Sequence, residues 1–294
     1  MTKEREGELF TVGLSVLESL FPILSIITIS LVGALHTYAF SLFIALLFFL
    51  VLMWKKNLFI ELKNTSAYRD LLLTSFYITL LFVLVFIGLR YTTAGNMSVI
   101  IFLQLLFSYL YFNIFGKEKM DLLHTLGALI MGIGALIILF PDDMQLNKGD
   151  LLIFIAAAVA PIANYYSKRA RKHYTSETIL GFRTLIALPV IALLAFIFEP
   201  SFTLGDFYAA LPYLLVIGLV IFGVSKVLWM EALHRISITK MSAIVALVPV
   251  MTLFFAWLFL DELPQGRQML GILPVLFGGY LLTKPLKIKE AKYK

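Results

Sequence analysis

Cysteine is absent from this 294-residue sequence, and histidine occurs only four times. The lack of a thiol excludes disulfide bonds and thiolate chemistry. The four histidines, at positions 36, 124, 173 and 234, show no spacing typical of metal ligands. We therefore predict neither a metal site nor a cysteine-based reaction.

Charged residues and nucleotide-binding motifs are scarce as well. Only 14% of the residues are charged, where an ordinary soluble domain has about 25%. The chain has no phosphate-binding loop of the Walker type, so ATP-driven transport by this chain alone is not expected. No Ser, His and Asp set occurs with a supporting motif. We expect no cofactor and no enzymatic activity, and a membrane enzyme with a buried acidic residue is kept only as a distant alternative.

Apolar sequence is what the chain has in abundance. Hydrophobic residues make up 61% of it, and the mean hydropathy is +0.94. A run of about 20 apolar residues crosses a bilayer as a helix, which is the only open-ended element that satisfies its own backbone there. The predicted helices are residues 9–29, 36–54, 69–89, 94–115, 121–140, 149–167, 177–198, 208–230, 240–260 and 266–284. The predicted fold class is an all-α integral membrane protein with ten transmembrane helices.

The positions of the basic residues predict the orientation of these helices. With the N-terminus in the cytoplasm, nineteen lysines and arginines fall in inside loops and tails, and three fall outside. Only Arg183 and Lys226 remain within the spans. Because positive charge stays on the cytoplasmic side, we predict a multi-pass protein of the cytoplasmic (inner) membrane with both termini inside. The net charge of +6 is thus explained by the membrane topology. It does not indicate nucleic-acid binding, and we expect no nucleic-acid partner.

Residues 1–140 and 147–284 follow one plan of five helices each, and residues 285–294 form a basic cytoplasmic tail. The last two helices of the two copies align at an offset of 144. The matched pairs include Met97 with Met241, Ser98 with Ser242, Glu118 with Glu262, Gly127 with Gly271 and Gly134 with Gly278. A unit of five spans that starts inside ends outside, so the second copy is predicted to lie upside down. Inverted repeats of this kind are typical of secondary transporters.

The second copy also carries a pattern known from a protein family. The pattern consists of Trp229, Glu231, Ala232, Leu233, Ser237, Met241, Ser242, Ala243, Leu247, Pro249, Val250, Leu260, Asp261, Glu262, Gly271 and Gly278. The first copy has a weaker version, with Thr93, Asn96, Ser98, Phe115, Gly116, Lys117, Glu118, Gly127 and Gly134, and with Leu105 in place of Pro249. Over nearly the whole chain these residues resemble the EamA-type repeat of the drug/metabolite transporter superfamily.

The resemblance implies two inverted five-helix halves around a central cavity lined mainly by helices 1, 3, 4, 6, 8 and 9, working by alternating access. It implies a small-molecule substrate, since the superfamily is associated with amino acids, other metabolites, nucleotide derivatives and drugs. We expect a secondary transporter, and an exporter, that is either coupled to protons or facilitative. One chain contains both halves, so a monomer suffices. The alternative is a channel-like or structural membrane protein without alternating access.

Glu18 is the strongest candidate for a role in transport. It lies near the middle of the first predicted helix, where an ionisable residue is a functional candidate by default. Thr11, Ser15, Pro22 and Ser25 share its helix face, and this polar stripe is predicted to face the cavity. Desolvation favours the neutral form of a carboxyl group, so Glu18 is expected to exchange protons and to compete with a cationic or zwitterionic substrate. A structural pairing with Lys226 or Arg183 is the alternative.

The remaining candidates are polar, aromatic or proline residues within the predicted helices. Those for substrate binding or coupling are Tyr77, Gln104, Asn164, Lys226 and Trp229, and those for hinges are Pro22 and Pro161. Lys226 and Arg183 either snorkel to the interface, which we expect more of Arg183, or point inward and favour a substrate with a carboxylate or phosphate. Glu118 and Glu262 are predicted to cap the helices that follow them. For the polar and aromatic candidates, interhelical packing is an equal alternative.

Overall fold

The computed structural model describes residues 2–114, 122–139, 147–233, 235–236, 241, 244–264 and 266–283, and within these ranges every regular element is a helix. The elements up to residue 139 are α1 (Lys3–Val32), α2 (Ala34–Lys55), the 3-10 helix η1 (Leu58–Lys63), α3 (Tyr68–Gly88), α4 (Ala94–Phe102), α5 (Gln104–Ile114) and α6 (Leu122–Leu139). Those after residue 147 are α7 (Lys148–Ala170), α8 (Ser176–Phe198), α9 (Leu204–Leu215), the π-helix η2 (Val216–Val224), α10 (Ser225–Leu233), α12 (Val248–Leu260) and α13 (Gly266–Thr283).

Polar residues mark where several of these helices begin. The Thr93 side chain accepts a hydrogen bond from an amide of the first turn of α4, and the Thr175 side chain does the same for α8. At α9, Thr203 and Asp206 form a reciprocal capping box. Such caps satisfy amides that have no partner in the first helical turn. Local sequence therefore sets these helix starts, which lie within a few residues of the predicted ones.

Eight of the described helical segments are long and apolar enough to cross a membrane. They are Lys3–Val32, Ala34–Lys55, Tyr68–Gly88, Ala94–Tyr111, Leu122–Leu139, Lys148–Ala170, Ser176–Phe198 and Leu204–Trp229, and two shorter apolar helices are Val248–Leu260 and Gln268–Thr283. Many large apolar side chains on their outer faces are exposed, among them Phe196 at 83% and Leu122 at 73%. Surface of this kind belongs against lipid. The chain is a multi-pass membrane protein.

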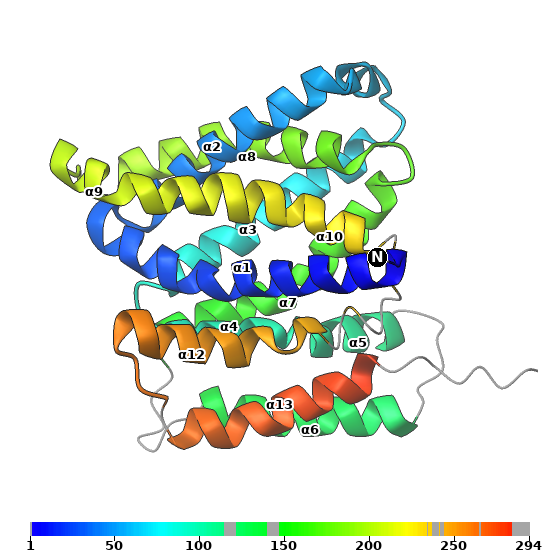
Figure 1. Cartoon of the computed structure of the whole chain (residues 1–294), viewed down its shortest axis with the longest axis vertical. Coiled ribbons are helices and arrows are strands. Elements are labelled where there is room, and N and C mark those ends of the chain that lie inside the picture. Colours follow the sequence, from blue (N-terminus) through cyan, green and yellow to red (C-terminus); the bar gives the residue numbers. More distant parts are fainter. Residues whose placement is uncertain are drawn as a thin grey trace, which may run out of the picture.

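The helices lie roughly side by side in one bundle (Figure 1). In this bundle α2 packs on α8, α3 on α7, α4 on α12 and α6 on α13, while α1 contacts α9, α10 and α12. Figure 1 shows the N-terminus at the same end of the bundle as the connections from α2 to α3 and from α7 to α8. Segments far apart in the sequence therefore form most of the helix contacts.

Glycines bring the backbones of α6 and α13 close together. A Cβ atom at Gly134 would lie 2.7 Å from the carbonyl oxygen of Gly271, and a Cβ atom at Gly278 would lie 2.5 Å from that of Gly127. No side chain fits at such distances, so the four glycines allow the close approach that the sequence predicts for them.

Two of the predicted helices are interrupted within the span, and a third, predicted over residues 240–260, has a turn at residues 246–247 before α12 begins at Val248. The first, predicted over residues 94–115, divides into α4 and α5 at a turn that contains Leu103. The second, predicted over residues 208–230, contains the nine-residue π-helix η2 between α9 and α10. π-helical segments are rare and are frequently found at functional sites. The hydropathy of the sequence predicts both spans but carries no signal for either irregularity.

We expect the substitution Gly218→Ala to lower the free energy of unfolding by about 1–3 kcal/mol, because it overpacks the contact between η2 and α2. A Cβ atom at Gly218 would lie 2.7 Å from Ile44 Cβ and 2.8 Å from the Ser41 carbonyl oxygen. Gly132→Ala in α6 is the matched control, since nothing lies within 4 Å of a Cβ atom there. Thermal unfolding of the purified variants in detergent measures the difference. Equal melting temperatures for the two variants would contradict the close packing at Gly218.

Candidate functional site

A cavity lies inside the bundle between α2, α3, α8 and η2. Its lining consists of Tyr38, Leu42, Ala45, Ile78, Thr79, Phe82, Arg183, Thr184, Ala187 and Phe222. The volume that the centre of a water molecule can occupy in this cavity is about 10 Å³. A cavity of this size holds about one water molecule. An organic substrate needs far more room, so the helices have to move before one enters.

The helices that line this cavity differ from those that the family resemblance implies. Of the six expected lining helices, only the third and the eighth contribute, as α3 and η2. The other walls come from α2 and α8, the second and seventh predicted helices. These two helices carry Ala45 and Ala187 at the cavity, and such small side chains leave space between them.

Arg183 is the only charged residue among those that line the cavity. The expectation that it snorkels to the interface is wrong, because Arg183 lies on the inward face of α8 together with Thr184 and Ala187. It interacts electrostatically with Tyr38 of α2, whose own hydroxyl group contacts the Thr79 side chain. Among the described carboxylates, none forms an ion pair with Arg183. The cavity therefore holds a cation whose charge the described part of the chain does not neutralise.

Aromatic rings form the wall beside this cation. Phe82 and Phe222 both line the cavity, and their ring centroids lie 5.0 Å apart. Tyr38 stacks on Phe86 at 5.0 Å, and Phe21 of α1 contacts Phe222 at 5.8 Å. Contacts between aromatic rings each stabilise the structure by about 0.5–1.5 kcal/mol beyond their buried area. The rings thus join α1, α2, α3 and η2 around the closed cavity.

Glu18 and Lys226 form an ion pair between α1 and α10. The Lys226 Nζ atom donates to Glu18 Oε1 at 2.5 Å, and the Ser225 hydroxyl group donates to the same oxygen at 2.9 Å. The two side chains remain 28% and 26% exposed, respectively. The sequence left this pairing open as an alternative, and the structure shows it. Glu18 therefore has an internal partner and also keeps some contact with the surroundings of the chain.

The ion pair is connected to the cavity through neighbouring residues on the same two helices. Phe21 follows Glu18 by about one turn, Phe222 precedes Lys226 by about one turn, and the two rings are in contact. Pro22 lacks the amide that would bond to the Glu18 carbonyl group. The contact between Phe21 and Phe222 thus lies between the ion pair and the cavity that Phe222 lines.

Comparison with known proteins identifies the family. The profile of the EamA-like transporter family matches residues 5–140 and, a second time, residues 147–284. The chain belongs to the EamA-like transporter family. This membership makes it a transporter-family membrane protein, and it implies a small-molecule substrate and a lipid bilayer as its surroundings.

Relatives within the EamA-like transporter family come from distant organisms. The chain is 30% identical to the uncharacterized transporter YoaV of Bacillus subtilis (strain 168), over 77% of this chain and 80% of that protein. It is 26% identical to an uncharacterized transporter of Archaeoglobus fulgidus, over 70% of this chain and 72% of that protein. A solved crystal structure superposes with a TM-score of 0.68 at 16% identity, over 95% of this chain and 97% of that one. At this identity the superposition shows the fold alone.

The other residues that the sequence singled out do not line the cavity of this EamA-family chain. Tyr77 of α3 stacks on Tyr166 of α7, with ring centroids 5.8 Å apart and planes within 1°. Gln104 is partly buried at the start of α5, while Asn164 and Trp229 are exposed. Of the six candidates for binding or coupling, the structure pairs only Glu18 with Lys226.

The two candidate hinge prolines are both buried, Pro22 within α1 and Pro161 within α7. Near Pro22, the Thr252 hydroxyl group of α12 donates to the Ser19 carbonyl group at 3.2 Å. Helix α1 is thus held at its proline by a neighbouring helix. Whether either proline bends during transport stays a prediction.

Sequence reasoning missed four polar residues of the site, Tyr38, Thr79, Thr184 and Ser225. Hydroxyl groups are common in membrane helices, so their positions alone give no signal. Arg183 did carry a signal, since an intramembrane arginine usually faces the bundle interior or a water-filled cavity. Arg183 also shares a helix face with the small residue Ala187, and this was the available evidence that its side chain points into the bundle.

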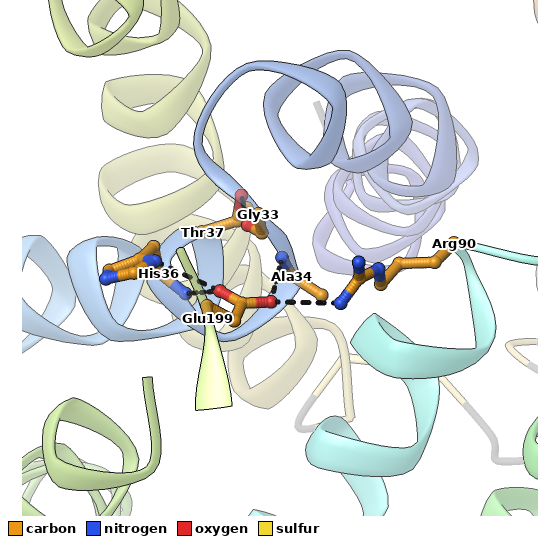
Figure 2. A network of polar contacts seen from close by, with 6 residues as sticks. All are labelled: Gly33, Ala34, His36, Thr37, Arg90 and Glu199. Atoms are coloured by element: carbon orange, nitrogen blue, oxygen red, sulfur yellow. Dashed lines mark hydrogen bonds and ion pairs between the residues drawn. The ribbon is translucent and has the colours of Figure 1, made fainter. Parts of the chain in front are cut away.

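A second polar cluster joins Glu199 to the start of α2 (Figure 2), and the connection from α1 to α2 lies at the end of the bundle opposite the N-terminus (Figure 1). The Glu199 carboxylate, which follows α8, accepts hydrogen bonds from the amides of Ala34 at 2.7 Å and His36 at 2.9 Å. Its oxygens also lie 3.1 Å from His36 Nδ1 and 3.5 Å from an Arg90 nitrogen. The carboxylate thereby satisfies the first turn of α2.

Glu262 also caps a helix, but not the helix that follows it in the sequence, as was predicted. Its carboxylate accepts a hydrogen bond from the Ala94 amide at 3.1 Å and so caps α4, not the following helix α13. Burial raises the pKa of the Glu262 carboxyl group above its ordinary value, and the bonds from the Ala94 and Gly95 amides act in the opposite direction. The equivalent Glu118 lies outside the described residues. Both described glutamates tie a helix of the second repeat to one of the first.

Proposed function

We propose that the chain is a secondary transporter of the cytoplasmic membrane that exports a small molecule by alternating access. Its moving parts are two inverted five-helix halves, residues 1–140 and 147–284, with both termini and the basic tail of residues 285–294 in the cytoplasm. In this proposal α4 with α5, and α9 with η2 and α10, each make one span. The shorter helices α12 and α13 complete the ten. One chain contains both halves, so a monomer suffices.

The crossed glycine contacts between α6 and α13 support this proposal most directly. Gly127 faces Gly278, and Gly134 faces Gly271. At the repeat offset of 144, Gly271 is the equivalent of Gly127, and Gly278 is the equivalent of Gly134. When every glycine is replaced by its equivalent, the contact between Gly127 and Gly278 becomes the contact between Gly271 and Gly134. This is the reciprocal pattern that a two-fold axis produces. Helices α2 and α8, and α4 and α12, are also equivalent pairs that pack together.

The distribution of charge supports the proposed orientation. The described loops near the N-terminus carry several basic residues, of which Lys56 pairs with Glu177 and Arg169 with Asp70. The opposite end has Arg90, which lies beside Glu199. Such a bias supports a cytoplasmic position for the N-terminal end.

The small cavity and the ion pair near it favour alternating access over a static pore. A pore needs a continuous opening, whereas this cavity holds about one water. In the proposed cycle, protonation of Glu18 weakens its attraction to Lys226 and frees α1 and α10 to move with Phe21 and Phe222. Amino acids, small metabolites and amphiphilic drugs are the proposed substrate range.

We expect purified protein in proteoliposomes to show counterflow, in which unlabelled substrate inside drives transient uptake of labelled substrate. Alternating access exchanges substrate in this way, whereas a channel-like protein only dissipates the gradient. A thermal-shift screen of amino acids, organic anions and lipophilic cations selects the substrate first, because a ligand that binds the native state raises its melting temperature. Flux of the selected compound without counterflow would contradict the proposal and favour a channel.

A further inference from the structure

The charges of Glu18, Lys226 and Arg183, which lie within the described spans, do not cancel. Glu18 and Lys226 neutralise one another at 2.5 Å, which leaves the charge of Arg183. Arg183 lines the cavity, where its described neighbours supply the hydroxyl groups of Tyr38, Thr79 and Thr184 but no carboxylate. The bundle thus encloses one positive charge at the place where a substrate would be held.

An unneutralised cation inside a membrane protein is costly, because the bundle interior replaces little of the hydration that the charge loses. Proteins keep such groups mainly where they act on a substrate or an ion. Glu18 is already paired with Lys226, so it does not neutralise Arg183. A bound anion in the cavity would do so.

We propose that Arg183 binds the carboxylate of the transported molecule, and that this molecule is a small monoanion with an apolar body. The inference rests on the proposed transport function. The guanidinium fork of an arginine matches a carboxylate with two parallel hydrogen bonds. One remaining positive charge matches one negative charge, which favours a carboxylate over a phosphate dianion.

The rest of the lining fits the other end of such a molecule. Phe82 and Phe222 present aromatic rings, and Leu42 and Ile78 present aliphatic side chains. Small-molecule sites commonly combine an apolar wall with a few polar groups that fix orientation. The cavity therefore offers one charged contact for the carboxylate and apolar walls for the body that carries it.

The test measures melting temperatures of purified protein with acetate, isovalerate and phenylacetate, each compared with its uncharged amide. We expect at least one carboxylate to stabilise the wild-type protein more than its amide does. Arg183→Gln and Arg183→Met should weaken apparent carboxylate affinity by roughly 10- to 100-fold, the range for loss of a charged hydrogen-bonded pair. Arg69→Gln, which alters an exposed arginine at the start of α3, should leave it unchanged.

A second readout needs no ligand. Because an unneutralised cation is removed, Arg183→Met should raise the melting temperature of the ligand-free protein by a few degrees. A structural arginine would give a decrease in the same experiment. Equal stabilisation by carboxylates and amides, an unchanged carboxylate response in Arg183→Gln, or a lower ligand-free melting temperature in Arg183→Met would each overturn the inference.

Counterflow separates this inference from the proposed function. Carboxylate binding that depends on Arg183, without counterflow, would support the anion site and contradict the transporter. Counterflow of an uncharged or cationic solute that Arg183→Gln does not change would support the transporter and overturn the anion site.

Discussion

Glu18→Gln is expected to lower the rate of substrate counterflow at least tenfold and to remove its dependence on pH. The neutral amide cannot take up or release the proton that drives the proposed cycle. It also leaves Lys226 without its partner. Breaking a fully buried ion pair costs about 3–5 kcal/mol, and because these side chains are 26–28% exposed we expect about 2–3 kcal/mol. Counterflow over a range of pH and thermal unfolding in detergent measure the two effects.

A double-mutant cycle distinguishes a role in coupling from a structural role. Lys226→Met alone should destabilise the protein as Glu18→Gln does, since each leaves one charge unpaired. The double variant contains neither charge, so its stability should recover most of the loss. If Glu18 carries the proton, counterflow in the double variant stays low although the fold is restored. Recovery of both stability and counterflow would make the pair structural.

Ser225→Ala provides the matched control for this cycle. It removes one hydrogen bond to Glu18 Oε1 but leaves the ion pair in place. We expect a loss of about 1 kcal/mol and a counterflow that still depends on pH. A Glu18→Gln variant that keeps both the wild-type rate and the pH dependence would dismiss the proton role.

The helical spans could be predicted from the sequence because lipid leaves the backbone so few alternatives. Any apolar run of sufficient length has to satisfy its amides internally, so the runs predict where the helices lie. Their bounds differ more, since α1 begins at Lys3 and α12 at Val248, where residues 9 and 240 were predicted. The glycines of α6 and α13 were predictable for a related reason. A repeat that keeps Gly127, Gly134, Gly271 and Gly278 in step indicates a close helix contact before any coordinates are known.

The functional side chains were harder to predict, because their roles depend on which helix faces meet. Glu18 was identified as a candidate from its charge alone. Its pairing with Lys226 could not be predicted, because it depends on how α10 packs against α1. For Arg183 the interface was favoured and the cavity kept as the alternative, since position along a helix does not show whether a side chain points outward or inward. Tyr38 gave no signal, because a buried tyrosine in an apolar run resembles any other aromatic packing residue.

Glu199→Ala is expected to destabilise the protein by about 3–5 kcal/mol. The Glu199 side chain is 2% exposed and accepts hydrogen bonds from two amides of the first turn of α2. Its removal leaves buried donors unsatisfied and deprives Arg90 of its partner, and each such loss costs about 1–3 kcal/mol. Glu199→Gln keeps one acceptor oxygen and should lose roughly half as much. Glu177→Ala is the control, since the exposed side chain of Lys56 makes its ion pair worth at most about 1 kcal/mol.

Gly33 allows a sharper test of the same cluster. Its φ angle of +92° favours glycine, and a Cβ atom there would lie 2.6 Å from Glu199 Oε2. Gly33→Ala should therefore destabilise the wild-type protein through both backbone strain and a collision with the carboxylate. In the Glu199→Ala background the collision is gone and only the strain remains, so the cost of Gly33→Ala should fall by about 1 kcal/mol or more. Strictly additive losses in unfolding free energy would show that the two residues do not meet.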